Sequence, residues 1–473
     1  MNPPIVRLFA LVIVLFALLV AYTSRWTVFE AQALRNHTAN SRTLLEEERV
    51  RRGRITTSDG QVLAGSKKLD RKRFKRRYPT GALFAHPIGY SFLVRGRSGL
   101  ERYYNEPLSG QRTELVSAVD SILGERRVGN DMQTTLSTAA QQAAVQGLGG
   151  RRGAVVAMDV STGAIRAMVS APSYDPNAVD DPAGANLDQA PGSPQINRAT
   201  QGRYPPGSTF KVVTAAAALD SGRYTPTSMV DGENGKRISG VPLQNFGGKD
   251  WGRIDLTTAL TYSVNTAWAS VGEELGGETM NDYMERFGFY ADPPLDYPDD
   301  QMLPSGVRPG GGGGRLLHPD NEEVDVGRMS IGQGRLEASA LQLATVAQTV
   351  ANGGVRMKPY LRERVIDSDG RTVEKAEPEE VERVMSEESA GQLTQMMRNV
   401  VREGTGTAAA MQGVQVAGKT GTAELNQSDL NQPWFIGFTP KHAVAVTIEA
   451  VQGGTGGEMA APIAKSVFEA LGE

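Results

Sequence analysis

A long apolar stretch near the amino terminus is the feature that most constrains how this chain is built. Residues 8–22 read LFALVIVLFALLVAY and contain no charged side chain. Ile5, Val6 and the flank from Trp26 to Phe29 extend the stretch around Arg7, whose flexible side chain can reach water, to about the 20 residues that cross a bilayer. A signal peptide would need small residues at its cleavage site, which Ala21-Tyr22-Thr23 matches poorly. We therefore predict an uncleaved anchor within residues 1–24, with the functional body on its carboxyl side.

The rest of the chain has the composition of a globular protein and lacks the signals of several kinds of site. With 473 residues, 40% of them hydrophobic and 22% charged, it has room for two or three domains with a core. A formal net charge of −3 does not favour a nucleic-acid partner. The absence of cysteine excludes disulfides and thiolate metal sites, and the four histidines show no metal-ligand spacing. We expect neither a metal nor a cofactor.

The first part of the body, residues 25–152, is rich in arginine and contains only short apolar runs. Residues 55–64 (ITTSDGQVLA) are typical of a hairpin that turns at Ser58-Asp59-Gly60. We expect this part to be a β-rich pedestal domain. Its most basic segment, residues 67–77 (KKLDRKRFKRR), is interpreted either as a solvated face or as a contact for anionic lipid or wall polymer.

The sequence pattern changes near Arg152, where we place a domain boundary. Residues 153–159 (GAVVAMD) and 164–170 (AIRAMVS) form a second hairpin pattern. Helical and strand periodicities then follow one another along the chain. Helices are expected at 208–222, 256–276, 338–352, 386–403 and 463–471, and strands at 414–422, 434–439 and 443–450. The pattern predicts an α+β domain at 153–473, with one mainly antiparallel sheet and flanking helices.

The segment GVQVAGKTGTAE at residues 413–424 fits two kinds of chemistry. Gly413 to Thr420 match the G-x-x-x-x-G-K-[ST] loop that binds nucleotide phosphates. Such a loop follows a buried strand and opens a helix, but residues 405–412 are small and polar, and no amphipathic helix follows before Pro433. The alternative is the Lys-Thr-Gly triplet of a serine acyltransferase, which requires two partner motifs elsewhere in the chain.

The first partner motif is Ser208-Thr209-Phe210-Lys211. The rigid residues Tyr204 to Gly207 (YPPG) precede it and place Ser208 at a helix N-terminus. Residues three apart share a helix face, so we expect the Lys211 amine beside the Ser208 hydroxyl. A serine becomes a nucleophile when a base takes its proton, and a lysine serves as that base only if its pKa falls well below about 10.4. Burial and the charge of Lys419 are expected to lower the pKa of Lys211.

The second motif, Ser263-Val264-Asn265, lies between two expected helices. An exposed turn at that point can direct both polar side chains into a cleft. In that arrangement Ser263 would pass a proton to the leaving group, and Asn265 would hold an amide of the substrate. Ser-x-Asn on its own is more typical of a helix cap, so its meaning depends on the other two motifs.

The third motif, Lys419 to Thr422, is expected on an edge strand. Lys419 and Thr420 can bind a substrate carboxylate there, and Gly421 lets another backbone approach closely. The backbone N–H groups of Thr422 and Ser208 can both donate to an oxyanion. The candidate catalytic residues are Ser208, Lys211 and Ser263, and the candidate substrate-binding residues are Asn265, Lys419, Thr420, Gly421 and Thr422.

Together the three motifs resemble those of the penicillin-binding proteins, which are serine D,D-transpeptidases. The single anchor and short pedestal are most similar to class B members, in particular to the actinobacterial penicillin-binding protein A group. A class A member would need an amino-terminal glycosyltransferase domain, for which the stretch between anchor and boundary is too short. The segments that carry the resemblance beyond the motifs are 99–110 (GLERYYNEPLSG), 197–199 (NRA), 204–211 (YPPGSTFK), 331–334 (IGQG) and 404–408 (GTGTA).

The resemblance implies a transpeptidase domain of β-lactamase-like fold behind a dimerisation-like pedestal. It implies that Ser208 attacks the penultimate D-Ala carbonyl of a stem peptide, and that the acyl group then passes to a neighbouring amine. Peptidoglycan stem peptides and lipid II-derived glycan strands are the implied substrates, and β-lactams are the implied inhibitors. Class B members commonly pair with a lipid II polymerase of the SEDS family through anchor and pedestal. This implies a single-pass protein of the cell membrane with an extracytoplasmic catalytic domain.

The sequence leaves two alternatives open. Water could replace the amine as acceptor, as in a carboxypeptidase or a β-lactamase. Class A β-lactamases use a dedicated glutamate for that step, and here Glu273 and Glu274 follow the second motif but are expected on its helix. The chain could instead be a catalytically silent wall or division scaffold, or a β-lactam sensor. The motifs do not distinguish roles in elongation, septation and sporulation.

Overall fold

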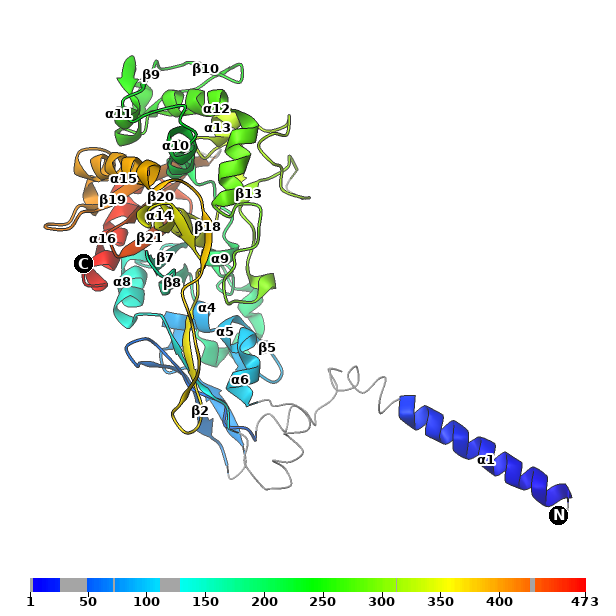
Figure 1. Ribbon diagram of the computed structural model, residues 1–473. Helices are drawn as coiled ribbons and strands as arrows, with labels where there is room; N and C mark the ends of the chain where they lie inside the picture. Colours follow the sequence, from blue (N-terminus) through cyan, green and yellow to red (C-terminus); the bar gives the residue numbers. More distant parts are fainter. Residues whose placement is uncertain (1–2, 26–48, 71–72, 111–127, 312, 426–429) are drawn as a thin grey trace.

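The computed structural model describes residues 3–25, 49–70, 73–110, 128–311, 313–425 and 430–473. The predicted anchor is a continuous helix, α1 (Pro3–Ser24), in which no residue is buried (Figure 1). With a rise of about 1.5 Å per residue its length is about 33 Å, close to the bilayer hydrocarbon core of about 30 Å. Within the described residues, it is the one helix long and apolar enough to cross a membrane. Its length and composition fit single-pass anchoring.

The pedestal is built around a six-stranded sheet with the strand order β17-β16-β6-β1-β2-β3. The predicted first hairpin is present, since Ile55 pairs with Ala64 across the turn and Gly60 has a φ of +85°. The strands are β1 (Ile55–Thr56), β2 (Val62–Lys68), β3 (Phe74–Arg77), β6 (Asp131–Thr134), β16 (Arg362–Ile366) and β17 (Thr372–Lys375). Because β16 and β17 come from far beyond Arg152, the pedestal sheet is completed by a segment from the second half of the chain, drawn in yellow in Figure 1.

A buried carboxylate lies at the centre of the pedestal. Glu101, on α5 (Gly99–Tyr103), accepts hydrogen bonds from Arg52 Nε at 2.6 Å and from Arg76 Nε at 2.5 Å. Arg76 belongs to the basic run, whose residues 71–72 lie outside the described part. The described residues of the run include the end of β2 and all of β3, and Arg76 is buried in the core, so the run is not only a solvated face. Burial disfavours ionisation of Glu101, but the two guanidiniums outweigh it and hold the pKa of the carboxyl below its ordinary value.

A second sheet, antiparallel throughout, forms the centre of the larger part of the chain. Its strand order is β19-β20-β21-β7-β8, and β22 pairs with β20. Val155 and Ala157 of β7 pack with α8 and α16, whereas Val156 and Met158 belong to the core that contains α14. The elements are α8 (Thr138–Leu148), β7 (Gly153–Asp159), β8 (Ile165–Ala171), α14 (Ala340–Ala351), β19 (Ala417–Leu425), β20 (Leu430–Phe438), β21 (His442–Ile448), β22 (Val451–Gln452) and α16 (Ala461–Ala470). Helices on both faces of an antiparallel sheet confirm the predicted α+β class.

Most of the expected elements are present, with shifted ends. The remaining predicted helices correspond to α10 (Lys211–Asp220), α11 (Leu256–Thr261), α12 (Asn265–Arg286) and α15 (Glu387–Arg402). The four strands from β15 (Val355–Met357) to β18 (Glu380–Arg383) were not predicted. Every residue of β17 and β18 is exposed, so no buried face imposes the alternation of apolar and polar side chains that marks a strand.

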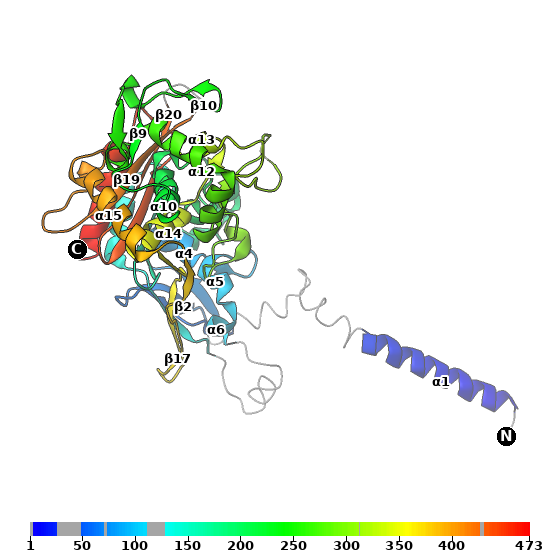
Figure 2. The same ribbon diagram turned by 45° about the horizontal axis from the view of Figure 1, so that its top comes forward.

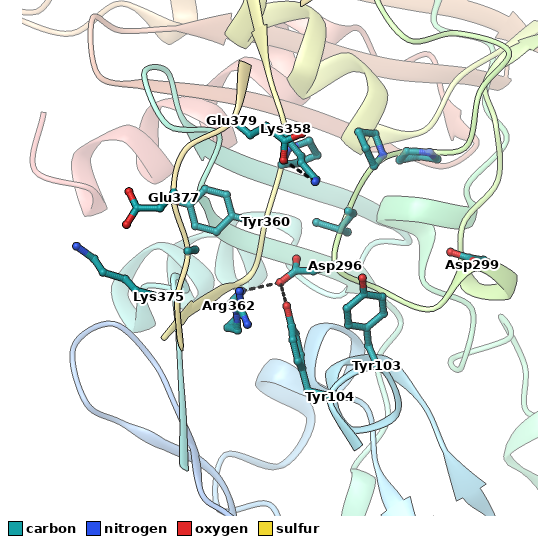
Figure 3. Close-up of a pocket in the computed structure, with 15 residues that line it drawn as sticks. Tyr103, Tyr104, Asp296, Asp299, Lys358, Tyr360, Arg362, Lys375, Glu377 and Glu379 are labelled. Carbon is teal, nitrogen blue, oxygen red and sulfur yellow. Dashed lines mark hydrogen bonds and ion pairs between the residues drawn. The ribbon is translucent and has the colours of Figure 1, made fainter. Parts of the chain in front are cut away.

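Asp296 joins three segments of the chain beside a cavity of about 550 Å³ (Figure 3). Its carboxylate accepts hydrogen bonds from the Tyr104 hydroxyl at 2.8 Å, the Leu361 N–H at 2.6 Å and the Arg362 N–H at 2.9 Å. Tyr104 follows α5, whereas Leu361 and Arg362 lead into β16. Burial raises the pKa of Asp296 to about 6, although these hydrogen bonds act in the opposite direction.

We expect Asp296→Asn to remove part of the pH dependence of stability. The carboxyl protonates near pH 6 in the folded chain and near pH 4 when unfolded. Its protonation therefore stabilises the folded state at low pH, and this contribution is lost as the pH rises through 6. The loss amounts to about 2 kcal/mol between about pH 4 and about pH 8. Thermal unfolding of both proteins measures it, and parallel stability curves would contradict the raised pKa.

Candidate active site

The turn that carries Ser208 is positioned by two glycines. Ser208 lies in the 3-10 turn Gly207–Phe210, which runs directly into α10, so the serine sits at the start of a helical segment as predicted. Gly207 has a φ of +52° and donates its N–H to Gly332 O at 3.0 Å. A Cβ on Gly332 would lie 1.9 Å from Gly207 O, so only glycine allows this approach. The IGQG segment therefore packs directly behind the serine turn.

Lys211 is fully buried and its amine points toward the second motif. Lys211 Nζ lies 2.8 Å from Ser263 O, 3.2 Å from Ser263 Oγ and 2.7 Å from Asn265 Oδ1. Among the described residues no hydrogen bond joins this amine to Ser208, and the expected proximity of the two groups stays a prediction. The three oxygen atoms around the amine account for its direction, because each lies within hydrogen-bond distance of Nζ.

Ser263 is the residue at which the two lysines meet. Its Oγ accepts a hydrogen bond from Lys419 Nζ at 2.8 Å, in addition to the one from Lys211. The turn lies between α11 and α12, as predicted, and Ser263 adopts a φ of +61°. This left-handed conformation costs a non-glycine residue on the order of 1 kcal/mol, and such strain is often found at functional sites.

The third motif lies on β19, the edge strand of the main sheet, as predicted. Lys419 is fully buried and also donates to Thr420 O at 3.0 Å. A Cβ on Gly421 would lie 2.8 Å from Pro206 O, so glycine lets the strand touch the serine turn. Thr422 Oγ1 accepts the Gly456 N–H at 3.2 Å. These contacts bring the third motif against the first.

The surroundings of the two lysines lower the pKa of both amines. Burial lowers the pKa of Lys211 well below its ordinary value, and the positive charge of Lys419 lowers it further. Burial lowers the pKa of Lys419 to about 7. The pKa of Lys211 is therefore shifted downward, as expected for a lysine that acts as a base. A neutral Lys211 amine has a lone pair with which to accept a proton.

The phosphate-loop interpretation of residues 413–420 does not fit the structure. The segment before it holds a short 3-10 turn (Thr407–Ala409), and the Gly-Lys-Thr residues lie inside β19 and open no helix. Within the described ranges, no group of three or more His, Asp or Glu residues is arranged to hold a metal ion.

Sequence reasoning missed the residues that support the second and third motifs. Asn265 Nδ2 donates to Gln244 O at 3.0 Å, and the buried Asn245 accepts the Thr266 N–H at 3.0 Å. No sequence motif identifies the loop that contains Gln244 and Asn245. Thr405 Oγ1 lies 2.6 Å from Thr420 Oγ1, and the only sequence feature that pointed to Thr405 was its place in the GTGTA segment.

Two family models match the chain. The model described as the penicillin binding protein transpeptidase domain matches residues 153–469. The model described as the penicillin binding protein A dimerisation domain matches residues 52–132. The first match alone spans more than half of the chain.

Named relatives and solved structures agree with these models. The peptidoglycan D,D-transpeptidase PbpA of Mycolicibacterium smegmatis is 37% identical over 501 residues, covering 99% of each chain. The protein of the same name from Mycobacterium tuberculosis is 35% identical over 500 residues, again covering 99% of each chain. The structure of penicillin-binding protein A from M. tuberculosis, as a ceftriaxone acyl-enzyme complex, has a TM-score of 0.81 at 34% identity and covers 91% of this chain and 100% of that chain.

Proposed function

This chain belongs to the family of penicillin-binding protein transpeptidases, and we propose that it cross-links peptidoglycan as a D,D-transpeptidase through an acyl-enzyme on Ser208. One observation supports the assignment of catalytic residues most strongly. The Lys211 and Lys419 amines both contact Ser263 Oγ, and Lys211 directly follows the Ser208 turn. A buried amine of lowered pKa, on the helix that directly follows the Ser208 turn, can supply the base that a serine nucleophile needs.

In the acylation step, Ser208 Oγ attacks the penultimate D-Ala carbonyl and transfers its proton to neutral Lys211. The backbone N–H groups of Ser208 and Thr422 stabilise the oxyanion. The C–N bond then breaks, and the proton passes from Lys211 through Ser263 to the departing D-Ala nitrogen. Ser263 suits this relay because its Oγ can accept from Lys419 while it exchanges a proton with Lys211. Asn265, Lys419, Thr420 and Gly421 hold the substrate.

In the second step, the amine of a neighbouring stem peptide attacks the Ser208 ester. The new amide forms, the ester C–O bond breaks, and the amine proton returns to Ser208 Oγ through Lys211. The glutamates considered for a hydrolytic step are engaged elsewhere. Glu273 accepts the Ser239 N–H at 2.7 Å, and Glu274 accepts the Tyr224 hydroxyl. This favours an amine over water as acceptor.

The parts of the chain suggest its domain boundaries, its position at the membrane and its partner. We assign residues 1–24 to the anchor, 25–152 to the pedestal and 153–473 to the transpeptidase domain, with residues 362–375 contributing strands to the pedestal sheet. The length and composition of α1 support single-pass anchoring in the cell membrane. The extracytoplasmic position of the catalytic domain is part of the proposal, because the proposed substrate, peptidoglycan, lies outside the cytoplasm. A SEDS-family polymerase is the partner proposed for anchor and pedestal, and β-lactams are the proposed inhibitors.

A cross-linking assay tests this function. The full-length chain is incubated with glycan strands polymerised from lipid II, with and without penicillin, and Ser208→Ala is run alongside. We expect cross-linked peptides that penicillin abolishes and that the variant does not form. Release of D-Ala without cross-links would favour a carboxypeptidase. Normal growth of cells that depend on Ser208→Ala would favour the scaffold.

A further inference from the structure

A small β-lobe between α10 and α11 stands beside the second motif (Figure 2). Its strands are β9 (Met229–Asp231), β10 (Arg237–Ile238), β11 (Val241–Pro242) and β12 (Arg253–Asp255). Asn245 is buried and donates from Nδ2 to Gly232 O at 2.9 Å and to Lys249 O at 3.2 Å. Because Asn245 also bonds to Thr266 and Gln244 bonds to Asn265, the loop of the lobe is fixed to the start of α12.

An aromatic surface lies on this lobe next to Ser263. Trp251 stacks on Tyr262 with ring centroids 4.9 Å apart and an interplanar angle of 25°. Tyr262, which directly precedes Ser263, is 40% exposed, and Phe246 on the same loop is 77% exposed. Large aromatic side chains exposed next to catalytic residues are typical of a binding surface. We call Lys249, Trp251 and Tyr262 the aromatic platform.

The platform carries a positive charge at Lys249. Lys249 Nζ lies 3.5 Å from the centroid of the Trp251 ring, a cation–π contact that holds the amine over the platform. No salt bridge joins Lys249 to an acidic residue in the described ranges. A cation above an aromatic surface suits a ligand that combines a carboxylate with an apolar or planar peptide group.

We propose that the aromatic platform binds the acidic stem peptide that delivers the acceptor amine. This inference rests on the proposed transpeptidase function. Ser263 connects two surfaces, since its Oγ faces Lys419 of the edge strand and its backbone continues into the platform through Tyr262. The edge strand can pair with the donor peptide. The platform is then available to the acceptor peptide. Lys249 would pair with a carboxylate of that peptide, close to the amine that reacts.

The test compares two acceptor peptides, one with a free carboxylate beside the reacting amine and one with that carboxylate amidated. For each, the rate of amine transfer at low acceptor concentration is divided by the rate of penicillin acylation of the same protein. We expect the wild type to transfer faster to the peptide with the free carboxylate. In Lys249→Glu, the normalised rate for that peptide divided by the normalised rate for the amidated peptide should drop about tenfold, so that the preference is lost. Lys236→Glu is the matched control, because Lys236 lies in the same lobe but pairs with Asp231 at 3.4 Å.

Trp251→Ala provides a second, uncharged variant. We expect it to raise the KM for both acceptor peptides, because the apolar contact serves each of them. An unchanged ratio in Lys249→Glu, or an equal loss in Lys236→Glu, would overturn the proposal. A wild type that forms the penicillin adduct but transfers to neither amine would contradict the proposed function and the subsite with it, whereas transfer without preference would overturn the subsite alone.

Discussion

Replacing Lys211 with methionine should lower the rate of acylation by penicillin by about 10³-fold, within the range of roughly 10² to 10⁴ that general-base catalysis contributes. Lys211 is the buried amine next to the serine turn, and burial together with Lys419 holds its pKa well below the ordinary value. Methionine has a similar length but no lone pair of comparable basicity, so Ser208 keeps its proton. The measurement is the rate constant for labelling by a fluorescent penicillin.

The pH dependence of acylation provides a second readout of the same role. The wild-type rate should fall as the pH drops through the pKa of Lys211, because the protonated amine is no longer a base. Lys211→Arg should be as slow as Lys211→Met at every pH, since a guanidinium does not lose its proton. Lys358→Met is the matched control, because this partly exposed lysine pairs with Glu379 away from the motifs. Retention of the wild-type rate within tenfold by Lys211→Met would contradict the role.

Replacing Glu101 with alanine should lower the free energy of unfolding of the pedestal by about 3–5 kcal/mol. The substitution leaves Arg52 and Arg76 with uncompensated charge, and Arg76 is almost wholly buried. Chemical denaturation and limited proteolysis of the full-length chain measure the change.

The control for Glu101→Ala is an exposed ion pair of the same kind. Arg102 Nη1 lies 2.8 Å from Asp300 Oδ2, with the two side chains 47% and 61% exposed. Asp300→Ala should cost less than about 1 kcal/mol, because water solvates both partners. A loss for Glu101→Ala as small as that for Asp300→Ala would show that the buried cluster does not hold the pedestal.

The residues of the three motifs could be located from the sequence because each motif is local. Two prolines and a glycine predict where the helical turn of Ser208 begins, and a break between helices predicts the turn at Ser263. The direction of the Lys211 side chain could not be predicted in this way. Spacing along one helix places it near Ser208, whereas its hydrogen-bond acceptors come from a segment about fifty residues away.

Parts of the fold that depend on contacts between distant segments also could not be predicted from the sequence. Strand β16 joins the pedestal sheet by pairing with β6, over 200 residues away in the chain, and β17 pairs in turn with β16. Strand β17 has no buried face to mark it in the sequence. Asp296 looks like an ordinary loop acid until Tyr104 and the backbone of Leu361 surround it. The stacking of Trp251 on Tyr262 likewise requires the folded lobe.

Mapping the penicillin adduct on the full-length chain by mass spectrometry tests most directly whether Ser208 is the nucleophile. We expect one stable acyl group on the peptide that contains Ser208, and no adduct on a Ser208→Ala variant that unfolds at the same temperature as the wild type. An adduct on any other residue, or equal labelling of folded Ser208→Ala, would contradict the acyl-enzyme mechanism.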